Sequence, residues 1–235
     1  MIGEPRLHEP VCVSTQQLLL DRADELPEGA IATADHQTGG RGRLGRAWED
    51  EPGASVLCSV LLRPPPERAA PELSLVAAAA TAEAVETATG LAAQIKWPND
   101  VMLNRRKVAG ILAEMRGEVA VVGIGVNVNQ TREQLPTDTH VLPGSLRSLT
   151  GCEYDREGLL ATMLERLQVR YDAWCGGGLD AVFHEIGSRN FLFGRPLRVG
   201  DVSGTGGSIA RDGRLEIVTA AGHVLVESGE VEFAR

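Results

Sequence analysis

The sequence predicts an α+β protein with a largely antiparallel β-sheet, several helices and a small carboxyl-terminal β-barrel. Three strand-like runs follow one another closely between residues 101 and 128, and the short polar turns between them are typical of antiparallel hairpins. Two long segments have helical composition or periodicity. Beyond Asn190, short β-like runs alternate with glycine turns, as in small barrels. The 235 residues allow one sizeable domain with a small appendage, so we expect domains at 1–188 and 189–235.

The amino-terminal half is predicted to contain two helices and two strands. Ser14 and Gln17 have the spacing of a capping box and precede three leucines, so a helix is expected from Ser14 to about Glu25. An alanine-rich segment at 71–89 predicts a long buried helix, with Gly90 as its C-cap. The two strands are expected at residues 30–34 and 55–62.

The carboxyl-terminal half is predicted to contain strands, one helix and the barrel. Large apolar residues recur at helical spacing between 155 and 174, and the three glycines that start at Gly176 end this helix. Sheet strands are expected at 92–96, 101–103, 108–115 and 119–128. Barrel strands are expected at 196–199, 207–210, 214–218, 223–226 and 230–233.

Composition argues against several classes of protein. The formal net charge of -9 is unsuited to general binding of nucleic-acid backbones. No apolar run approaches the length of a membrane span, and the first residues lack the form of a signal peptide, so we expect a cytoplasmic protein. The widely spaced cysteines favour unpaired thiols in a reducing compartment over a zinc site. They are Cys12, Cys58, Cys152 and Cys175.

The most informative segment is a glycine–arginine loop at residues 39–48, with four glycines, three arginines and a final tryptophan. Glycine lets backbone N–H groups approach a ligand closely, and the arginine guanidinium matches phosphate and carboxylate oxygens. Trp48 offers a surface on which a purine can stack, so the segment predicts a nucleotide site without regular secondary structure. It matches neither the P-loop nor G-x-G-x-x-G at the start of a helix, which disfavours both common nucleotide folds.

A second group of polar residues lies at 96–100, where the chain reads Lys-Trp-Pro-Asn-Asp. A hairpin can bring Lys107 back over the same end of the sheet. Gly110 and Gly125 interrupt two apolar strands, and because interior glycines often mark the close approach of a ligand, they predict a pocket floor. The alternative is that the lysines are ordinary solvated groups and that Asp100 only begins a strand.

Together these motifs resemble the catalytic domain of biotin–protein ligases. The resemblance rests on the glycine–arginine loop, residues 96–100, the run Lys-Val-Ala-Gly-Ile-Leu from Lys107 and the run Gly-Ile-Gly-Val-Asn-Val at 123–128, in this order. It covers essentially the whole chain and implies a mixed sheet backed by helices, with an SH3-like barrel. It also implies two reaction steps. The biotin carboxylate attacks the α-phosphorus of ATP, giving biotinyl-5′-adenylate and pyrophosphate, and a carrier lysine then takes the biotinyl group.

The resemblance implies substrates and partners as well. ATP with Mg2+ and biotin are the expected substrates, and no tightly bound cofactor is expected. The implied acceptor is the biotin carboxyl carrier domain of acetyl-CoA carboxylase or a related acyl-CoA carboxylase. Regulatory members carry a helix-turn-helix module before the catalytic core, and none is expected here, so neither nucleic acid nor membrane is an expected partner. The resemblance predicts no oligomeric state.

The resemblance implies a role for each matching position. Lys107, Arg41 and Arg43 match catalytic residues, with Lys107 bridging the biotin carboxylate and the α-phosphate. The positions around biotin are Ser14, Thr15, Gln16, Gln37, Gly40, Arg41, Gly42, Arg43, Lys107, Gly110 and Gly125. Those around ATP and the adenylate are Arg43, Arg46, Trp48, Lys107 and Asn127. Asp100 matches a carboxylate on the magnesium side. Gln16 stands where many relatives carry asparagine, which lengthens the reach of the amide.

Three other functions are compatible with parts of this pattern. A lipoate ligase or octanoyltransferase of the same fold would need an apolar channel for an aliphatic tail, whereas Gln37 and the polar residues 14–16 suit a ureido ring better. A biotin-sensing module without catalysis would not need Lys107. Nucleic-acid binding through the loop arginines would be salt-sensitive, and the acidic composition weighs against it.

Overall fold

The computed structural model describes residues 1–137, 139 and 141–233. The strands of its larger sheet are β1 (Arg6–Cys12), β2 (Ile31–Gln37), β3 (Ser55–Leu62), β4 (Ala93–Lys96), β5 (Asp100–Leu103), β6 (Arg106–Arg116) and β7 (Val119–Asn127). Their order in space is β1-β2-β3-β7-β6-β5-β4. Only β1 and β2 pair in parallel among these neighbours, so the sheet is mixed and largely antiparallel, which confirms the predicted fold class.

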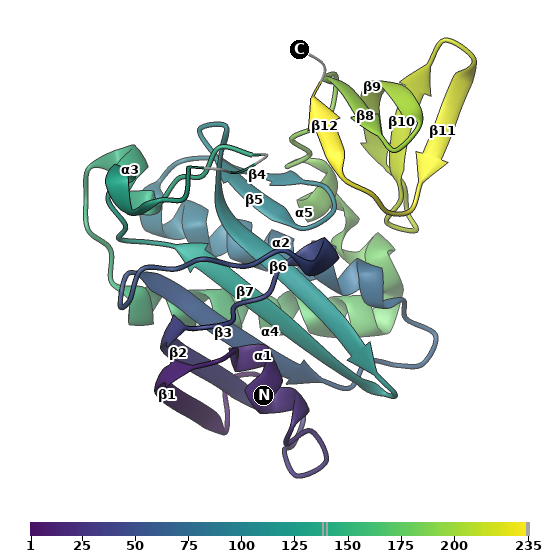
Figure 1. The fold of residues 1–235 in the computed structure, drawn as a ribbon. Helices are drawn as coiled ribbons and strands as arrows, with labels where there is room; N and C mark the ends of the chain where they lie inside the picture. Colours follow the sequence, from purple (N-terminus) through teal and green to yellow (C-terminus); the bar gives the residue numbers. More distant parts are fainter. Residues whose placement is uncertain (138, 140, 234–235) are drawn as a thin grey trace.

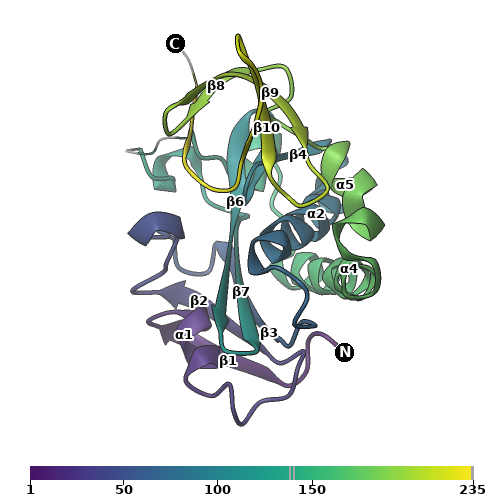
Figure 2. The ribbon, with the colours of Figure 1, turned by 90° about the vertical axis from the view of Figure 1, so that its right-hand side faces the viewer.

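Two long helices cover one face of this sheet. They are α2 (Ala70–Thr89) and α4 (Arg156–Gly177), and the shorter helices are α1 (Thr15–Leu20), α3 (Leu146–Thr150) and α5 (Phe183–Gly187). Gly90 adopts a left-handed conformation with φ of 71° and caps α2, as predicted. Figure 1 and Figure 2 show α1 and the glycine–arginine loop on the sheet face opposite α2 and α4. That opposite face is where a ligand can be held.

The central strands are buried on both faces, which explains their nearly continuous apolar sequence. All eight residues of β3 are buried. Val56 and Val60 belong to the core beneath α2 and α4, whereas Leu61 packs with Leu19 of α1 on the other face. None of the helices in the described part of the chain has the length and apolarity needed to cross a lipid bilayer.

The carboxyl-terminal strands form a second, antiparallel sheet of order β11-β10-β9-β8-β12, compatible with the expected SH3-like barrel. They are β8 (Pro196–Val199), β9 (Val202–Ile209), β10 (Leu215–Thr219), β11 (Gly222–Val226) and β12 (Val231–Phe233). The backbone N–H of Ile95 donates to Arg189 O at 2.7 Å and that of Phe191 to Ile95 O at 2.9 Å, so the connecting segment joins β4. Leu197 and Val231 belong to the main core. The domain boundary at 188 stays a prediction.

In the amino-terminal region the expected first helix was wrong in its length and its cap, and one strand was missed. The first helix spans only Thr15–Leu20, and Ser14 makes no capping hydrogen bond with its side chain. Instead, Gln37 Oε1 accepts from the Thr15 N–H at 2.8 Å, so a residue of β2 caps the helix. Strand β1 was not predicted at all, because its side chains are mostly exposed on both faces and show no alternation.

Candidate active site

The floor of the site consists of two paired glycines and a tryptophan. Gly110 of β6 lies opposite Gly125 of β7 in the sheet. A Cβ atom on Gly125 would lie 2.5 Å from Trp48 Cε2, and one on Gly110 would lie 2.9 Å from Trp48 Cζ3. The Trp48 indole therefore lies directly against both glycines, and any side chain there would displace it. The glycines do form a pocket floor, but one that Trp48 covers.

The cavity above this floor has a volume of about 750 Å³. It brings together the sequence-predicted residues Ser14, Thr15, Gln16, Gln37, Arg41, Gly42, Arg43, Arg46, Trp48, Asp100, Lys107, Gly110, Gly125 and Asn127. Gly40 does not line it. The Gly40 carbonyl accepts the Trp48 N–H at 2.9 Å, and a Cβ on Gly40 would lie 2.5 Å from Trp48 O, so Gly40 allows the two sides of the loop to approach.

One end of the cavity is lined by amide and hydroxyl groups. Gln37 Oε1 accepts from the Thr15 hydroxyl at 3.1 Å, and that hydroxyl lies 2.8 Å from Ser59 Oγ. Gln16 Nε2 donates to the carbonyl oxygens of Leu112 and Val121, at 3.3 and 3.2 Å. Its donors are therefore engaged by the sheet. The arrangement fixes the polar groups of this end without a ligand.

The other end carries two lysines that share one carboxylate. Lys107 Nζ lies 2.6 Å from Asp100 Oδ1, and Lys96 Nζ lies 3.6 Å from Asp100 Oδ2. The predicted hairpin therefore does return Lys107 to this end of the sheet. Burial lowers the pKa of Lys96, an effect that nearby Asp100 opposes. Lys96 and Lys107 share Asp100, and Glu230, which also acts on Lys96, pairs with Arg46, so cations outnumber carboxylates here and favour an anionic ligand. Lys107 also lies 5.7 Å from the centre of the Trp48 ring.

The three arginines of the glycine–arginine loop have different surroundings. Arg41 forms an ion pair with Glu114 of β6 at 2.9 Å, and Arg46 forms one with Glu230, just before β12. Both glutamates lie on elements outside the loop. Within the described residues Arg43 has no carboxylate in ion-pair contact, and burial lowers its pKa. Arg43 is therefore the loop arginine whose guanidinium is available to a bound anion.

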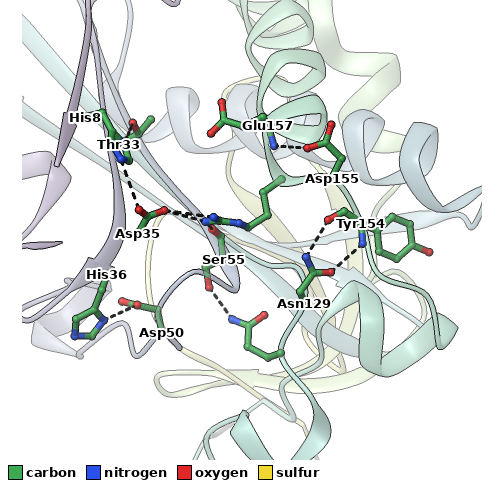
Figure 3. Close-up of polar contacts among 12 residues, drawn as sticks. His8, Thr33, Asp35, His36, Asp50, Ser55, Asn129, Tyr154, Asp155 and Glu157 are labelled. Carbon is green, nitrogen blue, oxygen red and sulfur yellow. Dashed lines mark hydrogen bonds and ion pairs between the residues drawn. The ribbon is translucent and has the colours of Figure 1, made fainter. Parts of the chain in front are cut away.

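The loop is more ordered than the sequence predicted. It contains a 3-10 turn at Arg43–Gly45, and Arg41 forms an isolated antiparallel bridge with Ala47, so the expectation of no regular structure was wrong. Just beyond the loop, Asp50 Oδ1 contacts His36 Nδ1 at 2.8 Å, as Figure 3 shows, and its Oδ2 accepts the Gln37 N–H at 3.2 Å. This contact ties the base of the loop to the end of β2.

The protein groups of the described residues form no dedicated magnesium site. Within the described residues, no three His, Cys, Asp or Glu side chains gather where they could hold a metal. Asp100, the carboxylate predicted for the magnesium side, faces two ammonium groups. Its metal role stays a prediction, and a magnesium ion arriving with ATP would depend on the phosphate oxygens for most of its ligands.

Sequence reasoning missed three parts of the cavity lining: Ser59, Glu230 and a group at positions 133, 135–137, 139, 141 and 143. Ser59 is a polar residue in a buried strand, a signal that could have identified it. Lys96 belongs to the run at 96–100 that the sequence singled out, and it is buried as well. Glu230 carries no such signal. Asn127, expected near adenine, has its amide in use, because Nδ2 donates to Gly144 O at 3.1 Å and Oδ1 accepts from Gln130 at 3.3 Å.

Comparison with known proteins agrees with this geometry. Residues 9–130 match the Biotin/lipoate A/B protein ligase family. The bifunctional ligase/repressor BirA of Bacillus subtilis is 33% identical, over 99% of this chain and 75% of that protein. The biotin--[acetyl-CoA-carboxylase] ligase of Paracoccus denitrificans is 35% identical, over 94% and 97%. The biotin protein ligase of Aquifex aeolicus, solved with biotin and ATP, superposes with a TM-score of 0.88 at 29% identity, covering 99% of each chain. The chain therefore belongs to the biotin/lipoate A/B protein ligase family.

Proposed function

We propose that this protein is a biotin–protein ligase that works in two steps. In the first, a biotin carboxylate oxygen attacks the α-phosphorus of ATP, a new P–O bond forms, and pyrophosphate leaves. In the second, the amine of a carrier lysine attacks the carbonyl carbon of the mixed anhydride, AMP leaves with the bonding electrons, and the amine proton passes to solvent. Neither step needs a nucleophile from the enzyme.

The observation that carries this proposal is the division of one cavity into a polar end and a cationic end. The polar end consists of the Gln37 amide and the hydroxyls of Thr15 and Ser59, which hydrogen bonds hold in place. These groups suit a ureido ring, which has both N–H donors and a carbonyl acceptor. Lys107 and Lys96 supply positive charge at the opposite end. A bicyclic urea with a carboxylate on a short chain matches both ends, whereas the tail of an aliphatic acid offers the polar end no hydrogen-bonding group.

The chemistry proposed for the cationic end is electrostatic. Two anions, a carboxylate and a triphosphate, must approach each other, and positive groups offset their repulsion most strongly as the new bond forms. Lys107 is the proposed bridge between the biotin carboxylate and the α-phosphate, and Arg43 the proposed contact to the adenylate phosphate. Both stand at the cavity, with Arg43 part-buried and without an ion-pair partner among the described residues.

The proposed acceptor is a lysine of the biotin carboxyl carrier domain of acetyl-CoA carboxylase or a related carboxylase. Support comes from the name of the Paracoccus denitrificans relative, biotin--[acetyl-CoA-carboxylase] ligase. We place the reaction in the cytoplasm, since the protein's four cysteines are unpaired, as expected in a reducing compartment.

The first step is tested by the exchange of labelled pyrophosphate into ATP, which requires a carboxylic acid substrate that the enzyme can activate. The purified protein is given ATP and Mg2+ with biotin, lipoate or octanoate in separate reactions. Exchange with biotin and background exchange with the two aliphatic acids support the proposal. Exchange with lipoate or octanoate and none with biotin would assign the other branch of the family. Absence of exchange with all three acids would point to a binding module.

A further inference from the structure

We propose that Glu114 is a positioning residue that holds the glycine–arginine loop closed over the cavity through its ion pair with Arg41. The pair joins the first turn of the loop to β6 at 2.9 Å. This inference rests on the proposed function, because the closed loop would retain a biotinyl-adenylate. It also gives Arg41 a role different from the one implied by the family resemblance, namely anchoring the loop rather than contacting biotin.

Glu114 stands at the rim of the proposed site. Side chains two residues apart on a strand point to the same face, so Gly110, Leu112 and Glu114 share the floor face of β6. Gly110 and Leu112 line the main cavity. Glu114 and Leu112 also border a second cavity of about 400 Å³, whose remaining lining comes entirely from residues 41–46 of the loop. The ion pair therefore spans the gap between the loop and the sheet edge.

The backbone hydrogen bonds of the loop do not supply this connection. At the base, Trp48 N donates to Gly40 O, and at the tip Gly42 N donates to Arg46 O at 2.7 Å and Arg46 N to Arg43 O at 3.3 Å. All of these bonds lie within the loop, and the remaining one, from Gly39 N to Val13 O at 2.9 Å, holds only its base, so none of them joins residues 41–46 to the sheet. The exposed Leu44 at the tip, with φ of 59°, does not anchor it in the core.

Among the described residues, the tip is joined to other elements by the side-chain ion pairs of Arg41 and Arg46. The first reaches the sheet that forms the floor, and the second reaches the carboxyl-terminal sheet. Trp48 at the end of the loop already lies on the floor glycines, and Glu114 is the contact that joins the other side of the loop, at Arg41, to the floor strand β6. Its side chain and that of Arg41 are 36% and 40% exposed, so salt weakens the pair.

The experiment measures how long the intermediate is retained. The full-length protein is loaded with labelled biotin and ATP, freed of excess substrate, and followed for release of biotinyl-adenylate into solution. The variants are Glu114→Gln, Arg41→Gln and the exchanged pair Arg41→Glu with Glu114→Arg. Glu118→Gln is the matched control, because Glu118 is an exposed acid at the turn between β6 and β7 and the charge change is the same.

We expect both single variants to release the intermediate faster by about two- to fivefold, the range that an exposed ion pair can supply. The exchanged pair should restore retention, and Glu118→Gln should match the wild type. Raising salt from about 0.1 M to 1 M, which shortens the screening length from about 10 Å to 3 Å, should accelerate release in the wild type more than in Glu114→Gln. A purely structural role would give no such difference.

Three results would overturn the inference: unchanged release from Glu114→Gln, equal salt responses of the wild type and Glu114→Gln, or an exchanged pair that releases the intermediate as fast as Arg41→Gln. Arg41→Gln keeps the test open if Glu114→Gln does not fold, which thermal unfolding detects. A wild-type protein that forms no biotinyl-adenylate would instead contradict the proposed function, so the two failures are distinguishable.

Discussion

Replacing Gly125 by alanine would place a methyl group inside the volume that the Trp48 indole occupies. The new Cβ would lie 2.5 Å from Cε2 and 2.6 Å from Cζ2 of that ring, whereas carbon atoms in good contact are about 3.5–4.0 Å apart. The ring must therefore move by about 1 Å, and a misplacement of this size at a reacting site can reduce the rate by about a hundredfold. Because Trp48 sits on a loop and can move outward, we expect a stability loss near the low end of the range of about 1–3 kcal/mol for overpacking.

The assay for Gly125→Ala compares biotin-dependent pyrophosphate exchange with urea unfolding. Exchange should fall by about two orders of magnitude while the protein stays folded. Gly176→Ala is the control, because a Cβ at this position of α4 meets nothing within 4 Å, and alanine favours a helix by up to about 1 kcal/mol over glycine. Normal exchange and normal biotin affinity in Gly125→Ala would show that Trp48 does not lie on the paired glycines in solution.

Four further outcomes are expected. Lys107→Ala should lower pyrophosphate exchange by about a hundredfold or more while biotin binding by calorimetry remains measurable, because an ammonium between two converging anions acts mainly in the transition state; near-normal exchange would mean an ordinary solvated lysine. Arg43→Gly should release the adenylate and biotinylate bulk albumin, and labelling no greater than with wild type would show that Arg43 does not retain it. Burial lowers the pKa of Lys96, so this ammonium loses its charge at a lower pH than an ordinary lysine. Pyrophosphate exchange should therefore fall as the pH rises through that pKa, and Lys96→Arg should move the fall to higher pH. Coincident pH profiles of the two proteins would argue against a charged role for Lys96. Burial raises the pKa of Cys58 to about 12, so iodoacetamide at neutral pH should modify the exposed Cys152 and leave Cys58 intact in the native protein, as peptide mass spectrometry can check.

The parts of the site that the sequence predicted correctly depend on local pattern. Glycines within apolar strands predicted the paired floor at Gly110 and Gly125, and the polar turn after β5 predicted that Lys107 returns over Asp100. Both follow from hairpin geometry, in which sequence neighbours become spatial neighbours. The end of α2 at Gly90 was also predicted from a local signal, the glycine that follows the helix.

The features that the sequence did not predict depend on contacts between segments that are distant in the chain. Ser14 and Gln17 suggested a capped helix of about three turns, but Gln37 of β2 caps α1 instead, and α1 ends at Leu20. Glu230 forms an ion pair with Arg46, which is far away in the sequence, and no local pattern near residue 230 predicts this pair. Local propensity is a weak guide wherever a tertiary contact supplies the hydrogen bond or the charge.

The central claim is that one cavity activates biotin as an adenylate. Mass spectrometry of the small molecules formed when the purified protein is incubated with biotin, ATP and Mg2+ tests it most directly, with lipoate and octanoate present as competing acids. We predict biotinyl-5′-AMP as the acyl-adenylate product, together with pyrophosphate. Lipoyl- or octanoyl-AMP in the absence of biotinyl-5′-AMP would contradict the account.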